Sequence, residues 1–359
     1  MKKIKIQNIV LILSLLCFLG CKKNTEVKEN GPKKHINLLW RNNRFDWITP
    51  SIITDQNSLF FGSLNNHFYS VDITTGAVHF KIKTDYNPFY KGIINKEHYY
   101  LTNYASALKC YYSNGTIKWT LQGDTTINKD ITAKNQYLYG TLKGIGYSKI
   151  NSTDGAIVWH LPQSEINTRT NKAAFYKDKI YLGVAENASK LLAIRDHDGS
   201  IIWENSYPEY NEINQVPTDK GILVSLSKDY KVGQMQLLNY DTGKIIWKQT
   251  YNCDTYYPPC IVGDNVIINA TDHTIISINS NNGKTNWILK LKNDQADTSI
   301  IAFKEQLYFG TLRRKLYNIA LVTGKVTFVE NFKYGLSTPV ICNHKLYFPT
   351  GGCELWELK

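Results

Sequence analysis

Several patterns that define other kinds of protein are missing from this sequence. After residue 21, no segment keeps apolar residues at the i, i+3, i+4, i+7 spacing of an amphipathic helix. No two cysteines have C-x-x-C spacing, and the motifs G-x-S-x-G, H-E-x-x-H and the P-loop are absent. These absences argue against a helical protein, a zinc-binding domain, and a hydrolase or nucleotide-binding enzyme of those types.

The first residues differ in character from the rest of the chain. MKKIKIQ is basic, and the apolar stretch NIVLILSLLCFLG is too short for a comfortable transmembrane helix. Residues 1–20 are therefore predicted to be a secretory signal peptide. The last four residues, FLGC, resemble the bacterial lipobox, which predicts a lipid on Cys21. A plain signal peptide with an incidental cysteine is the alternative. Residues 21–36 then form a polar, flexible tether.

The charge of the chain bears on its location and partners. Loss of the signal peptide removes Lys2, Lys3 and Lys5 and lowers the formal charge from +12 to +9. Secretion argues against nucleic acid as the partner of this basic surface. In families of sorted lipoproteins, an acidic residue after the lipid-bearing cysteine often directs retention or export. Lys22 and Lys23 stand there instead, which favours the periplasmic face of an outer membrane.

The cysteines beyond Cys21 are odd in number. Cys253 and Cys260 could bridge a loop in an oxidising compartment. We expect instead that all of them are small buried side chains. The five are Cys110, Cys253, Cys260, Cys342 and Cys353.

A short unit recurs along the chain. In YDTGKIIWKQ (240–249), a polar turn ends at Gly243 and Trp247 follows four residues later. Steps of 39, 40, 44, 44, 40 and 41 residues separate the glycines of seven such copies. A period of about 40 residues is typical of repeat architectures, whose units stack into one body. The copies are Gly76–Phe80, Gly115–Trp119, Gly155–Trp159, Gly199–Trp203, Gly243–Trp247, Gly283–Trp287 and Gly324–Phe328.

Each period contains four short predicted strands, so the chain is predicted to be an all-β propeller. In the first unit the strands are residues 48–54, 58–63, 67–73 and 77–83. The last unit has only three strands, and residues 37–43 at the other end of the chain supply the fourth. Pairing of the two ends removes an open sheet edge. We predict eight blades over residues 37–359, with seven as the alternative.

The repeated glycine and aromatic residue have predicted structural roles. The glycine lies in a hairpin turn that needs positive φ. The aromatic ring lies on the outermost strand, flat between blades, and a tryptophan N–H can reach a backbone carbonyl. A role in stacking on a ligand is the alternative. The predicted docking residues are Trp40, Phe80, Trp119, Trp159, Trp203, Trp247, Trp287 and Phe328.

SVDITTGAVHF (70–80) and LNYDTGKIIW (238–247) resemble the tryptophan-docking repeat of the PQQ-like, or quinoprotein-type, β-propellers. One branch of that family contains PQQ-dependent alcohol dehydrogenases, which carry an adjacent cysteine pair, calcium ligands and long insertions. This chain has no adjacent cysteines, so the resemblance implies the fold without catalysis, cofactor or metal. The other branch is an eight-bladed, lipid-anchored scaffold of outer-membrane β-barrel assembly, which is not an enzyme.

The loops of one face carry the candidate partner-binding residues. Aromatic residues and arginines form binding hot spots, and loops on a rigid scaffold carry function. The alternative is that tyrosines wall the loop bases and lysines keep the surface soluble. Asp196-His197-Asp198 resembles a metal cluster but is also ordinary turn chemistry. The residues are Tyr86, Phe89, Tyr90, Tyr207, Tyr210, Tyr256, Tyr257, Arg313, Arg314 and Tyr334.

Together these patterns predict a monomeric, lipid-anchored, non-catalytic scaffold that binds proteins in the cell envelope. Outer-membrane protein assembly is the leading role. An oxidoreductase using PQQ and a ligand-binding or immunity-type lipoprotein are the alternatives.

Overall fold

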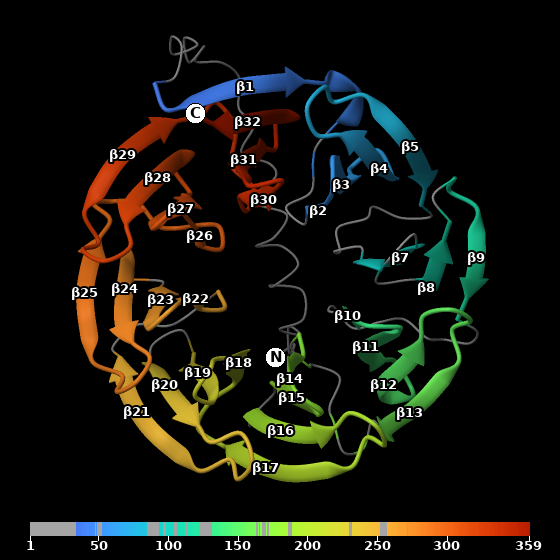
Figure 1. Ribbon diagram of the computed structural model, residues 1–359, viewed down its shortest axis with the longest axis vertical. Helices are drawn as coiled ribbons and strands as arrows, with labels where there is room; N and C mark the ends of the chain where they lie inside the picture. Colours follow the sequence, from blue (N-terminus) through green and yellow to red (C-terminus); the bar gives the residue numbers. More distant parts are fainter. Residues whose placement is uncertain are drawn as a thin grey trace, which may run out of the picture. The chain divides into compact units, whose positions relative to one another are not determined.

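The computed structural model describes residues 34–359 except for short segments in between. Those segments are 47, 49–51, 85–92, 96–97, 104–105, 113, 122–130, 163, 165, 167–169, 171, 186–188, 230–231, 252–256 and 271. The described residues form eight antiparallel sheets of four strands each, which Figure 1 shows as the blades of a ring. In each blade the inner strand is named a and the outer strand d. Within the described ranges, no helix is long and apolar enough to cross a membrane.

Seven blades are continuous in sequence, and their strands follow one another from the inside of the ring to the outside (Figure 1). Blade 1 comprises β2 (Ile53–Asp55), β3 (Ser58–Ser63), β4 (His67–Asp72) and β5 (Val78–Lys83), and blade 2 comprises β6 (Ile93–Asn95), β7 (His98–Asn103), β8 (Ser106–Tyr111) and β9 (Ile117–Thr120). Blade 3 comprises β10 (Thr132–Lys134), β11 (Tyr137–Leu142), β12 (Gly146–Asn151) and β13 (Ile157–Pro162). Blade 4 comprises β14 (Ala174–Tyr176), β15 (Lys179–Val184), β16 (Ser189–Arg195) and β17 (Ile201–Tyr207). Blade 5 comprises β18 (Glu212–Pro217), β19 (Ile222–Lys228), β20 (Val232–Leu238) and β21 (Ile245–Tyr251). Blade 6 comprises β22 (Cys260–Val262), β23 (Asn265–Asn269), β24 (Thr274–Asn279) and β25 (Thr285–Lys290). Blade 7 comprises β26 (Ile301–Phe303), β27 (Gln306–Gly310), β28 (Lys315–Ala320) and β29 (Val326–Asn331).

Blade 8 is assembled from both ends of the chain. Its strands are β30 (Val340–Cys342), β31 (Lys345–Thr350), β32 (Glu354–Leu358) and β1 (Ile36–Arg41). β1 pairs with β32 in antiparallel register, from Ile36 opposite Leu358 to Arg41 opposite Glu354. The prediction of eight blades closed by the N-terminal strand is confirmed, and the alternative of seven is wrong. A 3-10 helix, η1 (Asn43–Phe45), follows β1.

The first predicted strand of blade 1 is shorter than expected. β2 begins at Ile53, whereas Ile48 makes only an isolated bridge to Ser63. The middle strands match their predicted bounds closely, and both of their faces are buried. In β4, Phe68 and Tyr69 point to opposite faces, yet they are 2% and 5% exposed. A blade therefore contacts a neighbour on each side, so a middle strand has no face left for water.

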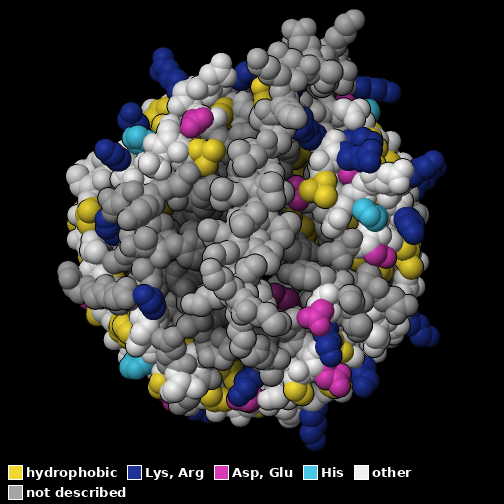
Figure 2. Space-filling view, turned by 180° about the vertical axis from the view of Figure 1, so that it is seen from behind, with side chains coloured by type: hydrophobic (Ala, Val, Ile, Leu, Met, Phe, Trp, Pro, Cys, Tyr) yellow, Lys and Arg dark blue, Asp and Glu magenta, His cyan; other side chains and the backbone are white. Residues whose placement is uncertain are grey.

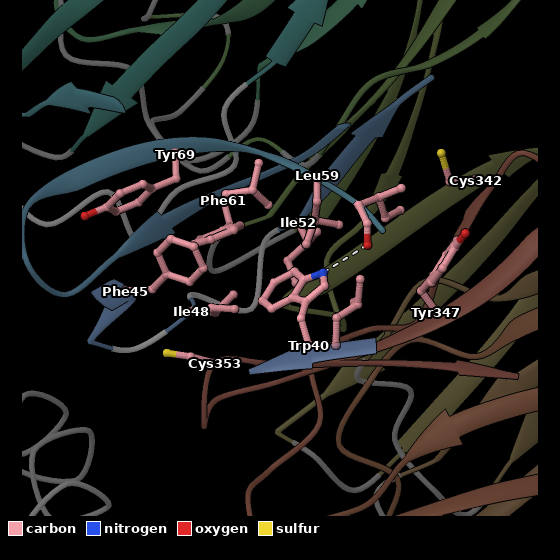
Figure 3. Packing of buried hydrophobic residues seen from close by; sticks show 13 residues of the cluster. Trp40, Phe45, Ile48, Ile52, Leu59, Phe61, Tyr69, Cys342, Tyr347 and Cys353 are labelled. Carbon is pink, nitrogen blue, oxygen red and sulfur yellow. Dashed lines mark hydrogen bonds between the residues drawn. The ribbon is translucent and has the colours of Figure 1, made fainter. Parts of the chain in front are cut away.

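The contact between blades 8 and 1 closes the ring. Figure 3 shows Trp40 of β1 among apolar side chains that come from both ends of the chain. Phe45 lies 5.0 Å from Phe61 and 6.0 Å from Trp40, measured between ring centroids. Cys353 follows β31 and belongs to the same cluster. Apolar burial thus joins the two termini in addition to the β1–β32 hydrogen bonds.

Candidate partner-binding face

The two faces of the propeller are defined by which connections emerge on them. Neighbouring strands are antiparallel, so the b–c and d–a connections leave the sheets on one face, here called the loop face. The a–b and c–d connections leave on the other face, here called the turn face. The repeated glycines lie in the c–d turns and have positive φ; Gly243, for example, has a φ of 66°.

The aromatic residue on strand d docks onto the next blade and not onto its own turn. The indole N–H of Trp247 donates to the Ser280 carbonyl of blade 6 at 2.8 Å. A Cβ built on Gly283 of that turn would lie 2.6 Å from Cε3 of Trp247, so only glycine leaves room for the ring. Five other pairs repeat this contact: Trp40–Gly76, Trp119–Gly155, Trp159–Gly199, Trp203–Gly243 and Trp287–Gly324.

The two phenylalanines in this position make different contacts. Phe80 packs against Tyr99 of blade 2, with 5.0 Å between the ring centroids. A Cβ built on Gly115, the turn glycine of blade 2, would lie 3.4 Å from Cγ1 of Ile82. Phe328 precedes blade 8, which has no c–d turn because its strand d comes from the N-terminus. His35 takes that place and stacks on Phe328, with 4.1 Å between ring centroids and 4° between planes.

A second docking residue, on strand b, was not identified from the sequence. The hydroxyl of Tyr100 donates to the Ser152 carbonyl at 3.0 Å, and Trp119 uses the same acceptor at 3.1 Å. Tyr181 and Trp203 likewise share the Tyr240 carbonyl, both at 3.0 Å. Such paired hydrogen bonds satisfy the polar atoms of aromatic groups that lie between blades. The tyrosine recurs with the same period, and that was the available signal.

Asp196 of the Asp196-His197-Asp198 sequence lies in an inter-blade ion-pair network. Its carboxylate accepts hydrogen bonds from Lys149 at 2.8 Å, from Tyr139 at 2.7 Å and from Lys134 at 3.2 Å. Burial alone would raise the pKa of Asp196, but the hydrogen bonds, with that from Lys149 first, lower it below its usual 3.8. Among the residues described, no group of three or more His, Cys, Asp or Glu is arranged to hold a metal ion.

Part of the predicted partner-binding set belongs to the wall between blades 4 and 5. Tyr207 and Tyr210 are half-buried and pack against the apolar cluster around Tyr181 and Ile213. Burial raises the pKa of Tyr207 to about 12. These two tyrosines therefore have a structural role at the base of the loop.

Another part of the set is exposed on the loop face of blade 7. Leu312, Arg313 and Arg314 form the b–c connection, and the side chain of Leu312 is 60% exposed. The backbone N–H of Arg313 donates to the buried Asp294 carboxylate at 3.3 Å, which holds the loop in place. Tyr257, half-buried, donates from its hydroxyl to the Asp297 carbonyl at 2.8 Å.

The ring of Tyr334, in the next d–a loop, lies against Gly352 of blade 8. A Cβ on Gly352 would meet Cδ2 of Tyr334 at 2.0 Å, so glycine is required beneath the ring. Nζ of Lys333 lies 5.4 Å from the centroid of the same ring. The remaining predicted residues, Tyr86, Phe89, Tyr90 and Tyr256, lie outside the described residues, as does Cys21.

Four described cysteines are free thiols, and Cys253 lies outside the described residues. Cys110, Cys342 and Cys353 are buried, and Cys260 is half-buried. Burial raises the pKa of Cys110 and of Cys353 to about 11. These thiols are protonated at neutral pH and pack as small apolar side chains.

The fold resembles several solved structures. BamB from Moraxella catarrhalis matches with a TM-score of 0.68 and 12% identity, over 90% of this chain and 100% of that one. The computationally designed protein Ika8 matches with a TM-score of 0.73 and 10% identity, over 91% and 99%. The quinohemoprotein alcohol dehydrogenase ADHIIG from Pseudomonas putida HK5 matches with a TM-score of 0.65 and 10% identity, over 87% and 71%. At such low identity these likenesses show the fold alone.

The sequence comparisons are more selective. A search of curated proteins returned no match. A family profile described as outer membrane protein assembly factor BamB matches residues 93–219 and again residues 212–331. The two matches together span more than half of the chain and fall within blades 2 to 7. This chain therefore belongs to the family of outer membrane protein assembly factor BamB, within the PQQ-like propellers.

Proposed function

We propose that this protein is a non-catalytic scaffold of the cell envelope that binds a protein partner of outer-membrane assembly through its loop face. The lipid on Cys21 attaches it to the outer membrane, facing the periplasm, and the polar segment between Cys21 and β1 serves as the tether. The main support for this proposal is the b–c loop of blade 7, because Leu312, Arg313 and Arg314 are exposed to solvent on a rigid support. Membership of the BamB family supports the choice of partner.

The experiment is affinity purification of the tagged full-length chain from envelope fractions of its own bacterium. We expect the outer-membrane barrel insertase to co-purify. We also expect metabolic palmitate labelling of the wild-type chain and loss of the label in Cys21→Ser. A wild-type chain that never brings down the insertase, under conditions that preserve other envelope complexes, would contradict the assembly role and favour a ligand-binding or immunity-type lipoprotein.

An oxidoreductase using PQQ is the competing function, because the fold also resembles a quinohemoprotein alcohol dehydrogenase. The seven cysteines of the sequence include no adjacent pair, which the dehydrogenase branch places over its cofactor. We expect no PQQ-dependent dye reduction by the purified protein with primary alcohols. Turnover that depends on added PQQ would replace the scaffold proposal with the enzymatic one.

A further inference from the structure

Arginine is distributed very unevenly in this chain. The sequence contains six arginines and 36 lysines, and the lysines are spread over all blades. Four of the six arginines fall in blades 7, 8 and 1, near the point where the ring closes. The concentration of arginine therefore points to recognition, because the guanidinium group binds planar anions in a way that lysine does not. The four are Arg41, Arg44, Arg313 and Arg314, called here the arginine rim.

A chain of contacts on the loop face joins these residues. Nη1 of Arg314 donates to the Lys333 carbonyl at 2.9 Å. The neighbouring Tyr334 lies against Gly352. The backbone N–H of Asn42 then donates to the Cys353 carbonyl at 3.0 Å. The rim is therefore continuous across two blade boundaries, although its members are more than 260 residues apart in sequence.

The last step of this contact chain reaches blade 1. The Asn65 side-chain amide donates to the Arg44 carbonyl at 3.4 Å, and this places η1 beside the b–c loop of blade 1. Figure 2, which views the side opposite to Figure 1, shows Lys and Arg side chains, both dark blue, all around the outline, with one group at the upper right.

Carboxylates of the protein neutralise the rim only in part. The buried Glu354 pairs with Arg41 at 2.5 Å, and its side chain is 3% exposed. Asp46, two residues after Arg44, is exposed. Arg313 and Arg314 have no acidic residue within their own loop, Thr311 to Lys315. Lys333 adds a further cation beside them. The four arginines and Lys333 outnumber the nearby carboxylates, which are those of Glu354, Asp46 and the buried Asp294.

We propose that the arginine rim binds an acidic, carboxylate-rich segment of a protein partner. Guanidinium groups form bidentate pairs with carboxylates. Leu312 and Tyr334 would contact apolar side chains that lie between the carboxylates of the bound segment. The exposed leucine and the aromatic ring favour a protein segment over a lipid headgroup. The direction of β1 favours it too. β1 begins on the turn face, so the first strand of the propeller starts on the side opposite to the rim. The inference rests on the proposed scaffold function and names the chemistry of the partner.

The test measures binding of a fluorescein-labelled peptide of Glu-Leu-Gly repeats to the full chain by anisotropy. We expect Arg313→Ala with Arg314→Ala to raise the Kd about tenfold or more, because two charge-assisted contacts are lost. Arg44→Glu on blade 1 should weaken binding as well. The matched control is Lys244→Ala with Lys284→Ala, which removes two exposed cations from the turn face and should leave the Kd unchanged. Circular dichroism shows whether each variant is folded.

Three further measurements identify the ligand class. Exchange of Glu for Gln in the peptide should abolish binding. Higher salt should weaken binding, since the Debye length falls from about 10 Å at 0.1 M to about 3 Å at 1 M. Vesicles of phosphatidylglycerol should bind the wild type no better than the rim variant. Rim-dependent binding to vesicles without peptide binding would overturn the inference in favour of a membrane. Equal losses in the rim variant and the lysine control would overturn it in favour of unspecific attraction.

The inference and the proposed function can fail separately. Co-purification of the barrel insertase with both the wild type and the rim variant would support the scaffold role and refute the rim as its binding site. Rim-dependent peptide binding without any insertase in the purified complex would support the rim and refute the assembly role.

Discussion

Substitution of Gly283 by alanine tests how the blades are held together. The built Cβ lies 2.6 Å from Cε3 and 2.9 Å from Cζ3 of Trp247, well inside ordinary contact distance. Gly283 also has a φ of 70°, and an L-residue pays about 1–2 kcal/mol for that conformation. The clash adds about 1–3 kcal/mol, as in other overpacked cores. We therefore expect Gly283→Ala to lower the free energy of unfolding by about 2–5 kcal/mol.

Gly263 provides the matched control, because its φ is 54° and nothing lies within 4 Å of a built Cβ. Gly263→Ala pays only for its backbone conformation, so it should cost about 1–2 kcal/mol. Urea unfolding, followed by tryptophan fluorescence and by circular dichroism, measures both values. Equal losses for the two alanine variants would refute the steric part of the reasoning.

A double-mutant cycle isolates the contact further. Trp247→Phe alone loses the hydrogen bond to Ser280, at about 1 kcal/mol, together with part of the buried ring. In the Gly283→Ala background, the smaller phenylalanine ring also relieves the clash with the added Cβ. The loss of unfolding free energy in the double variant should therefore be about 1 kcal/mol smaller than the sum of the losses in the two single variants. The contact between blades 1 and 2 already combines a phenylalanine, Phe80, with a roomier turn, since the Cβ built on Gly115 meets only Ile82 as a side chain. Additive losses would show that the ring and the turn act independently.

Two further predictions concern stability. Trp247→Ala should cost about 3–5 kcal/mol in urea unfolding, as expected for truncation of a large buried ring, and should leave peptide binding by the folded protein unchanged. Asp196→Asn should lower stability at pH 7. The pKa of Asp196 is lower in the folded state, so its contribution is complete above pH ~4 and is lost as pH falls through the folded pKa. Unfolding measured from pH 7 to pH 2 should therefore show a shallower decline for Asp196→Asn than for the wild type, whereas Asp219→Asn, at an exposed side chain, should follow the wild type. Parallel curves for the wild type and Asp196→Asn would contradict this account.

The regular part of the sequence predicted the fold well, and the reason is physical. Blades 1 to 7 each have a turn glycine and an outer aromatic residue, so these recur with the period of the blade. Gly283 and Trp287 are close in sequence, but Gly283 contacts Trp247 of the preceding blade. A spacing within one unit reports the length of that unit and does not name the partner across the interface.

The loop residues were harder to interpret because each loop is individual. Tyr207 contributes to a wall between blades, whereas Arg313 is exposed, and both follow from burial that the sequence does not encode locally. No pattern in the sequence identified Arg41 and Arg44 as candidate binding residues. They join Arg313 only because β1 crosses the ring closure, and this pairing connects the most distant parts of the chain.

That closure also sets the order in which the molecule can be completed. Leu358 lies 322 positions after its partner Ile36, so at about 5–20 residues per second the N-terminal strand waits about 15–65 s for its partner to be synthesised. Blades 1 to 7 can form during that time, whereas blade 8 cannot exist in any chain that stops before β32. A prematurely terminated product would keep Trp40 exposed and the edge of β1 unpaired, and quality-control proteases recognise such features. The pairing of β1 with β32 is therefore possible only after the chain has been synthesised through β32.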